Sequence, residues 1–271
     1  MRRFLLAAVI CGAAMPGARA ADLSDLPILR GPVGGLSSSR VNWQGFYVGG
    51  QGAFGTSDMD FTGATQSVVQ KLLFDTAIDN SGGVSNWPLG SPASIHGNGW
   101  GAFGGYNSQW DDVVVGLEFN YLHGKFGGSQ IDSMSRSFVD SSGALDIITY
   151  QSIAAVNLSD MATLRARAGY AWGIFLPYLF GGLALAQADI VRTASVFGDQ
   201  VDPTTGVRVP FFITASDNQN QRLIHGYSIG AGVDMMVYSC LFLRAEWEYV
   251  RYAAAIDTNV NTFRVGLGYK F

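Results

Sequence analysis

The end of the chain alternates strictly between apolar and polar positions. In residues 261–271 every second side chain is apolar: Phe263, Val265, Leu267, Tyr269 and Phe271. The intervening positions are polar, charged or glycine: Thr262, Arg264, Gly266, Gly268 and Lys270. Because successive side chains of a β-strand point to opposite faces, this pattern predicts a final strand with one apolar face and one polar face.

The same alternation recurs along the chain. It predicts seven earlier strands, at residues 45–55, 95–110, 113–123, 161–172, 176–188, 222–236 and 241–249. Short alternating strands are typical of membrane barrels, in which apolar positions face lipid and polar positions face a wet interior. Trp100 and Trp110 lie roughly 33 Å apart along their strand, which suits the two aromatic girdles of such a barrel. Phe103 departs from the parity of its strand, and residues 176–188 are apolar on both faces, so these two orientations stay open.

The connections between the predicted strands alternate in length. Residues 56–94, 125–160 and 189–221 form long connections, residues 251–260 form a moderate one, and the others are short turns. Outer-membrane barrels have short periplasmic turns and longer outer loops. Closing the sheet also removes the unpaired edges that lipid cannot satisfy. We therefore predict an all-β fold, an eight-stranded antiparallel up-and-down transmembrane β-barrel with long outer loops and both termini in the periplasm.

One stretch permits another interpretation. Residues 170–188 contain no charged side chain and are long enough for a membrane-spanning helix. However, Pro177 lies in the middle of this stretch, and neighbouring glycines further disfavour a helix. We favour two strand ends joined by a turn near residues 172–175, with the spanning helix as the alternative.

Composition agrees with a surface that faces lipid. Charged residues make up 14% of the chain, whereas ordinary soluble domains contain about 25%. The N-terminus has the form of an export signal: Arg2 and Arg3 precede an apolar stretch at 4–14 and a small-residue cleavage site at 18–20. The expected organisation is a signal peptide at 1–20, a periplasmic linker rich in Pro, Gly and Ser at 21–42, and a barrel at 43–271.

Export changes both the charge and the cysteine count. Without the signal peptide, 14 of the 17 Lys and Arg residues remain against 21 acidic residues, a net charge of about −7. This acidity argues against nucleic acid as a partner. Cys240 would be the one remaining cysteine, so we expect no intrachain disulfide.

Several motifs support an outer-membrane assignment. They are WQGFYVGG at 43–50, GLE at 116–118, LRARAGY at 164–170, LPY at 176–178, LRAE at 243–246 and VGLGYKF at 265–271. Their combination resembles the α-proteobacterial outer-membrane immunogenic proteins of the porin family, whose barrels are similar to the OmpA-type transmembrane domain. The resemblance implies insertion by the barrel-assembly machinery, which reads a terminal aromatic strand; here that assembly signal is Phe263, Val265, Leu267, Tyr269 and Phe271. It also implies periplasmic chaperones, outer-membrane lipid and lipopolysaccharide as partners, and we expect a monomer.

The polar parity of the predicted strands carries balanced charges. Four arginines, Arg165, Arg167, Arg244 and Arg264, face four carboxylates, Glu118, Asp234, Glu246 and Glu248. An eight-stranded barrel is just wide enough to be filled by side chains. Buried charges must be paired, and arginine–carboxylate pairs achieve this best. We expect a lumen charge network that plugs the barrel, with a gated narrow pore as the functional alternative.

The remaining candidate sites are weak. His96, His123 and His225 fall near the outer ends of predicted strands, on the lipid-facing parity, and lack the spacing of metal ligands. Two GxGxxG matches, at 50–55 and 99–104, lack the strand-to-helix context of a dinucleotide site. With no recognisable catalytic motif either, we expect neither an enzyme nor a cofactor or metal.

Three functional hypotheses remain. The first is a structural outer-membrane barrel that displays its loops on the cell surface. The second is a small passive porin or a haem- or ligand-binding surface receptor. The third is a soluble lipocalin-like barrel, which would place apolar residues inside and much more charge outside.

Overall fold

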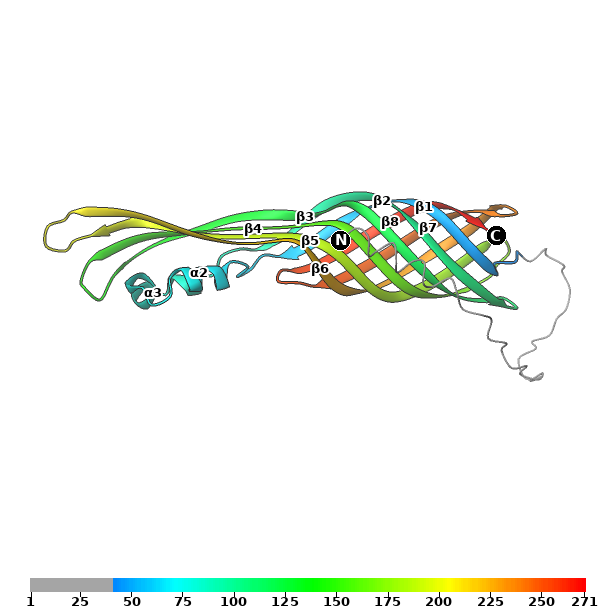
Figure 1. Cartoon of the computed structure of the whole chain (residues 1–271), viewed down its shortest axis with the longest axis horizontal. Coiled ribbons are helices and arrows are strands. Elements are labelled where there is room, and N and C mark those ends of the chain that lie inside the picture. The colour runs from blue at the N-terminus through cyan, green and yellow to red at the C-terminus, as the bar shows by residue number, and fades with distance from the viewer. Residues whose placement is uncertain (1–40) are drawn as a thin grey trace, which may run out of the picture. The chain divides into compact units, whose positions relative to one another are not determined.

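The described part of the chain, residues 41–271 of a computed structural model, forms a closed antiparallel barrel (Figure 1). The predicted signal peptide and nearly all of the predicted linker lie outside these described residues. Each strand pairs with the next in sequence, and β8 pairs with β1 to close the ring. The strands are β1 (Gly45–Asp60), β2 (Pro92–Trp110), β3 (Val113–Val139), β4 (Leu145–Tyr170), β5 (Phe175–Val201), β6 (Arg208–Tyr238), β7 (Leu241–Ala253) and β8 (Asp257–Lys270). The predicted eight-stranded fold is confirmed.

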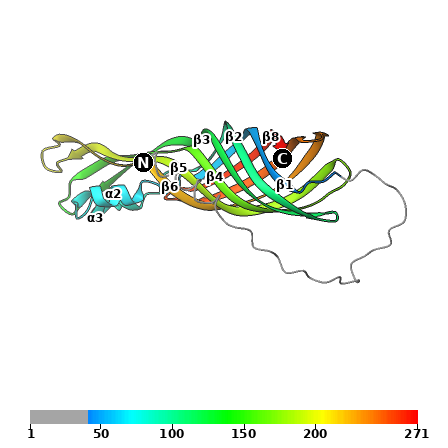
Figure 2. The same cartoon turned by 45° about the vertical axis from the view of Figure 1, so that its right-hand side comes forward.

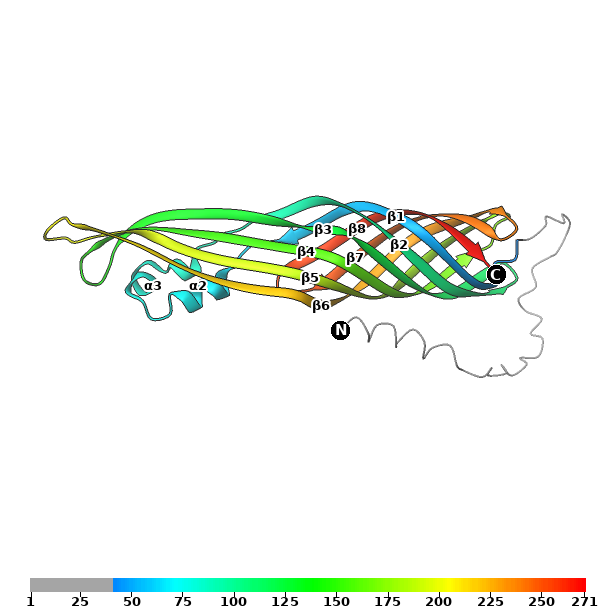
Figure 3. The same ribbon diagram turned by 45° about the horizontal axis from the view of Figure 1, so that its top comes forward.

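Strands β3 to β6 continue well beyond the barrel and form a four-stranded sheet, here called the extension (Figures 1–3). It comprises residues 126–139, 145–158, 190–201 and 208–219. The expected long loops at 125–160 and 189–221 are therefore wrong. Each is a pair of long strands joined by a short connection, at 140–144 and 202–207. The moderate connection expected at 251–260 is also wrong, because β7 and β8 continue to Ala253 and Asp257 and leave a turn at 254–256.

The sequence pattern missed the extension because its two faces differ less than those of the barrel. Along β4, Ile148 and Tyr150 point inward, but so do Asp146 and Ser152. The outward positions between them are also mixed in polarity. The pattern expected of a strand that faces lipid, with every second side chain apolar, therefore ends where the strands leave the barrel.

Three β-bulges mark the level at which the strands leave the barrel. The register shifts between His123 and Phe126, between Leu158 and Asp160, and between Ala188 and Ile190. Beside the last bulge, Gln221 has a positive φ of 52° and its N–H donates to Asp189 Oδ1 at 2.7 Å. Because bulges bend and twist strands, they allow a curved ring to continue as an open sheet.

The connection between β1 and β2 is folded and packs on the inner face of the extension. It contains α2 (Gln66–Leu72), α3 (Ala77–Gly82) and the 3₁₀ helix η3 (Val84–Asn86). Thr65 anchors it through hydrogen bonds of 2.7 Å with Tyr150 and with Ser152. Its apolar side chains bury a core against the sheet, formed by Val68, Val69, Leu73, Val84, Trp87, Leu89, Ile148, Tyr150, Ala194 and Val196. The predicted polar loop at 56–94 is thus a structured cover.

The alternative of a spanning helix at 170–188 is wrong. These residues form the end of β4, a turn at 171–174 and the first half of β5. Within the described residues, the helices are too short or too polar to cross a membrane.

Replacing Val69 with alanine tests whether the cover is held by this core. Val69 is fully buried, so the change should loosen the cover locally and leave the barrel intact. We expect limited proteolysis of the folded protein to cut within residues 61–91 several-fold faster, because local opening exposes the backbone there. The exposed Gln70 provides the control, since Gln70→Ala should leave the cleavage rate unchanged.

Candidate functional site

The structure places all eight predicted lumen charges inside the barrel, where each side chain is at least 97% buried. Alternation along β3, β4, β6, β7 and β8 turns these positions inward while their sequence neighbours face outward. Leu117 is 64% exposed next to a buried Glu118, and Leu164 is 57% exposed next to a buried Arg165. The inward positions bring together Glu118, Arg165, Arg167, Asp234, Arg244, Glu246, Glu248 and Arg264.

Glu118 is the centre of the network. Its carboxylate accepts from Arg165 Nε at 3.0 Å, from Arg167 Nη1 at 3.2 Å and from Arg244 Nη1 at 2.8 Å. The Tyr47 hydroxyl donates to the same carboxylate at 2.7 Å. One buried acid is therefore shared by three guanidinium groups from two sides of the barrel.

Asp234 and Glu246 complete the pairing of these arginines. Asp234 accepts from Arg244 Nε at 2.8 Å and from Arg167 Nη2 at 2.7 Å. Glu246 accepts from Arg165 Nη2 at 2.7 Å. The Tyr178 hydroxyl donates to Glu246 Oε1 at 2.5 Å and also lies 3.1 Å from Asp234 Oδ1. Hydrogen bonds to ionised groups are stronger than neutral ones, so the network compensates much of the cost of burying these charges.

The fourth arginine forms a second cluster next to the first. Arg264 pairs with Glu248 and donates to Asn120 Oδ1 at 2.9 Å. Asn120 in turn accepts from Gln51 Nε2 at 2.9 Å. Glu248 lies 3.5 Å from Arg165 Nη1, which connects the two clusters into one network.

Aromatic rings lie against three of the guanidinium groups, a feature that counting charges did not predict. Arg244 lies 3.9 Å from the Phe103 ring centroid, Arg167 lies 3.7 Å from that of Tyr178, and Arg165 lies 4.1 Å from that of Phe180. Cation–π attraction is strongest between desolvated groups, and these arginines and rings are all buried. Phe103 and the even-numbered residues of β5 therefore point inward, which settles the two orientations that the sequence left open.

Inward glycines make room for these rings. A Cβ atom at Gly49 would lie 2.3 Å from Phe103, and one at Gly230 would lie 2.4 Å from Phe180. Such distances are closer than real Cβ contacts, so a larger residue at either position would displace a ring. Gly49 and Gly230 therefore leave the space that these lumen rings occupy, a role that alternation alone does not reveal.

Apolar layers lie on both sides of the charges, which alternation alone did not predict. Toward the short turns, the lumen is filled by Trp43, Tyr47, Phe103, Val114, Leu176, Tyr178, Phe180, Met236 and Phe242. Toward the extension, a larger layer includes Met59, Phe61, Leu122, Phe126, Met161, Ile224, Tyr252 and Ile256. Phe61 comes from the folded cover, so the cover contributes to closing this end of the barrel.

The histidines lie where the sequence placed them, on the outside of the barrel. His96, His123 and His225 are all exposed, and His123 Nδ1 is 2.8 Å from Asp160 Oδ1. In residues 41–271, no three His, Cys, Asp or Glu side chains are arranged to hold a metal ion.

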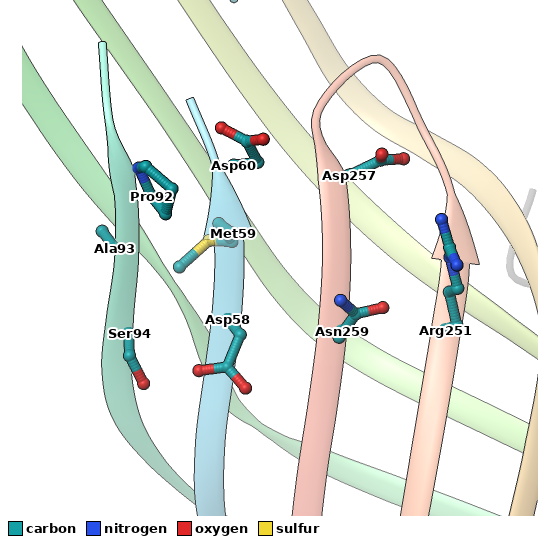
Figure 4. A pocket seen from close by; sticks show the side chains of 9 residues that line it. All are labelled: Asp58, Met59, Asp60, Pro92, Ala93, Ser94, Arg251, Asp257 and Asn259. Carbon is teal, nitrogen blue, oxygen red and sulfur yellow. The ribbon is translucent and has the colours of Figure 1, made fainter. Parts of the chain in front are cut away.

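A hollow of about 440 Å³ lies at the ends of β1, β2, β7 and β8 that are nearer the extension (Figure 4). Asp58 and Asp60 border it together with Asp257 and Arg251 from the neighbouring hairpin. Asp60 and Asp257 are paired in the register and both are exposed to solvent. This region is a solvated acidic rim, and its geometry assigns it no ligand.

Comparison with known proteins identifies the family. The profile of the outer membrane protein beta-barrel domain matches residues 4–271. The chain belongs to this outer-membrane barrel family. Among its relatives is the 25 kDa outer-membrane immunogenic protein of Brucella ovis, which is 27% identical over 180 residues, covering 66% of this chain and 67% of that protein. The 22 kDa outer membrane protein of Rhizobium leguminosarum bv. viciae is 23% identical over 240 residues, covering 85% and 79%.

These relatives confirm the predicted resemblance and place this barrel in the outer membrane. The soluble lipocalin-like alternative is excluded by the same finding. Solved barrels of low identity also align with the chain. Ail of Yersinia pestis is 14% identical, covering 84% of this chain and 99% of its own, with a TM-score of 0.36. Neisserial surface protein A is 13% identical, covering 83% and 97%, with a TM-score of 0.34.

Proposed function

We propose that this protein is a non-catalytic structural barrel of the outer membrane, with a closed lumen, that displays its extension on the cell surface. The observation that carries the proposal is the continuous filling of the lumen. A paired charge layer lies between two apolar layers, and an interior filled in this way by side chains offers no open path for ions.

The distribution of turns supports the orientation. Both described chain ends and the β2–β3, β4–β5 and β6–β7 turns lie at one end of the barrel, where Phe271 N donates to Phe46 O at 2.9 Å. The extension and its cover lie at the other end. In outer-membrane barrels short turns are periplasmic, so both termini would face the periplasm and the extension would face outward.

The same proposal includes the route of assembly. On β8, the residues of the terminal aromatic strand face outward, with Leu267 51% exposed and Phe271 73% exposed. They are thus available to the barrel-assembly machinery before β8 closes on β1. Periplasmic chaperones would deliver the chain, and the closed monomer would then meet outer-membrane lipid and lipopolysaccharide.

Conductance in planar lipid bilayers tests the closed lumen. The refolded wild-type protein should insert without producing stable open channels, because the charge layer is paired and the apolar layers exclude water. Insertion is verified separately by the shift in gel mobility between unboiled and boiled samples. Large and long-lived conductance steps would contradict closure and favour the passive porin instead.

A further inference from the structure

The outer face of the extension has an unusual chemistry. This face consists of the outward residues at 129–139, 145–155, 191–201 and 208–218, which the register aligns in rows across the four strands. One such row runs from Ser135 through Thr149 and Phe197 to Phe212. The charged side chains of these described rows, Asp199 and Arg208, lie in the two rows farthest from the barrel, and the four rows nearer the barrel contain no charge.

Hydroxyl groups and apolar side chains replace charge on this face. Cross-strand hydroxyl pairs join Ser135 to Thr149 at 2.8 Å, Thr193 to Ser216 at 2.9 Å and Ser195 to Thr214 at 3.0 Å. Between them, Ile131 and Phe212 are each 65% exposed. A protein surface that meets only water usually carries abundant charge, so this face is suited to a neutral partner.

The inner face of the same sheet provides the comparison. It includes Asp132, Arg136, Arg192 and Asp217, and Arg192 pairs with Asp217. The folded cover packs against it, with Arg136 stacked 5.2 Å from the Trp87 ring. The lack of charge is therefore specific to the outer face and does not follow from the composition of the strands.

The outer face is continuous with the surface that contacts the membrane. Below it, at the level of the bulges, the outward positions carry titratable groups: His123, Lys125, Asp160, Asp189 and His225. Further down, the outward positions are apolar, as shown by Leu117, Leu164 and Leu183, which are 64%, 57% and 71% exposed. Along one wall the chemistry thus changes from apolar, to ionisable, to neutral and hydroxylated.

This order matches the layers of a lipopolysaccharide molecule, whose acyl chains lead to charged phosphates and then to sugars. We propose that the outer face of the extension packs against the saccharide of the lipopolysaccharide that surrounds the barrel. Its hydroxyl groups would exchange hydrogen bonds with sugar hydroxyls, while Ile131 and Phe212 would contact the apolar faces of the sugar rings. The inference rests on the proposed orientation, in which the extension lies outside the cell.

Cysteine accessibility on intact cells tests this packing. In a Cys240→Ser background, Ser133→Cys and Ser216→Cys place thiols on the outer face, and Ser141→Cys places one on the exposed hairpin at the end of the extension. Each variant is reacted with a polyethylene-glycol maleimide in two strains. One strain carries complete lipopolysaccharide, and the other carries lipopolysaccharide truncated to its innermost sugars.

We expect both outer-face thiols to react at least tenfold more slowly in the complete strain than in the truncated strain. Ser141→Cys should react at the same rate in both. Equal labelling of the outer-face thiols in the two strains would overturn the proposal, whether that labelling is fast or slow; slow labelling in both would indicate a protein cover. If Ser141→Cys reacts only after the cells are disrupted, the proposed orientation itself has failed. Unboiled gel mobility confirms that each variant is folded.

Discussion

Replacing Glu118 with glutamine is expected to lower the free energy of unfolding of the barrel by about 3–5 kcal/mol, the usual cost of breaking a buried ion pair by removing one partner. Glu118 is only 1% exposed and accepts from three arginines. Without its charge, Arg165, Arg167 and Arg244 share two carboxylates, Asp234 and Glu246, and one buried positive charge loses its compensation. Urea unfolding in lipid vesicles, followed by tryptophan fluorescence, measures the change.

An exposed ion pair provides the control for this prediction. Asp199 lies 4.0 Å from Arg208 at the surface of the extension. Exposed pairs contribute about 0–1 kcal/mol, so Asp199→Asn should leave the unfolding midpoint almost unchanged. If Glu118→Gln changes the unfolding midpoint as little as Asp199→Asn does, the lumen is hydrated enough to screen its charges. The closed-lumen proposal then loses its main support.

Replacing Gly49 with alanine is expected to destabilise the barrel by about 1–3 kcal/mol, the typical cost of overpacking a core. The added Cβ atom would lie 2.3 Å from Phe103 Cζ and 2.5 Å from the backbone oxygen of Leu267. The ring can rotate away only by leaving its contact with Arg244, and the backbone oxygen belongs to the seam that closes β1 onto β8. The change should therefore disturb both closure and the charge layer.

Gly52 is a matched control in the same strand. A Cβ atom at Gly52 meets no other atom within 4 Å, so Gly52→Ala should be neutral or slightly stabilising through the unfolded state. Unfolding of the two variants is compared in parallel, together with the fraction that migrates as folded protein without boiling. Equal stability of the two variants would show that Phe103 does not occupy the space above Gly49.

The alternation of side chains was sufficient to predict the barrel. Leu117 beside Glu118 and Leu164 beside Arg165 show why: with a period of two, one parity must face lipid if the other carries charge. The eight lumen charges could be named for the same reason, since a strand that crosses lipid has no other place for them. Motifs such as the terminal VGLGYKF further predicted the outer-membrane barrel family, which the comparisons confirm.

Other features depend on contacts between distant residues, which periodicity does not contain. Nothing local to Phe103 shows that its ring fills the space above Gly49 and stacks on Arg244. Likewise, Val69 and Trp87 lie in a segment that looks like a polar loop until the extension gives them a surface to pack against. The extension itself was missed because, outside the lipid layer, neither parity has to be wholly apolar.

By itself, the sequence determined which side of most barrel strands meets lipid, because exposing a charge to hydrocarbon is costly and side chains of a strand alternate with a fixed period of two. For β2 and β5 it left the orientation open. Only the tertiary structure decided how far β3 to β6 extend, what covers them and how the lumen is filled. These features depend on contacts between side chains of different strands. Such contacts are set by the register and the bulges, and not by the order of residues within any one strand.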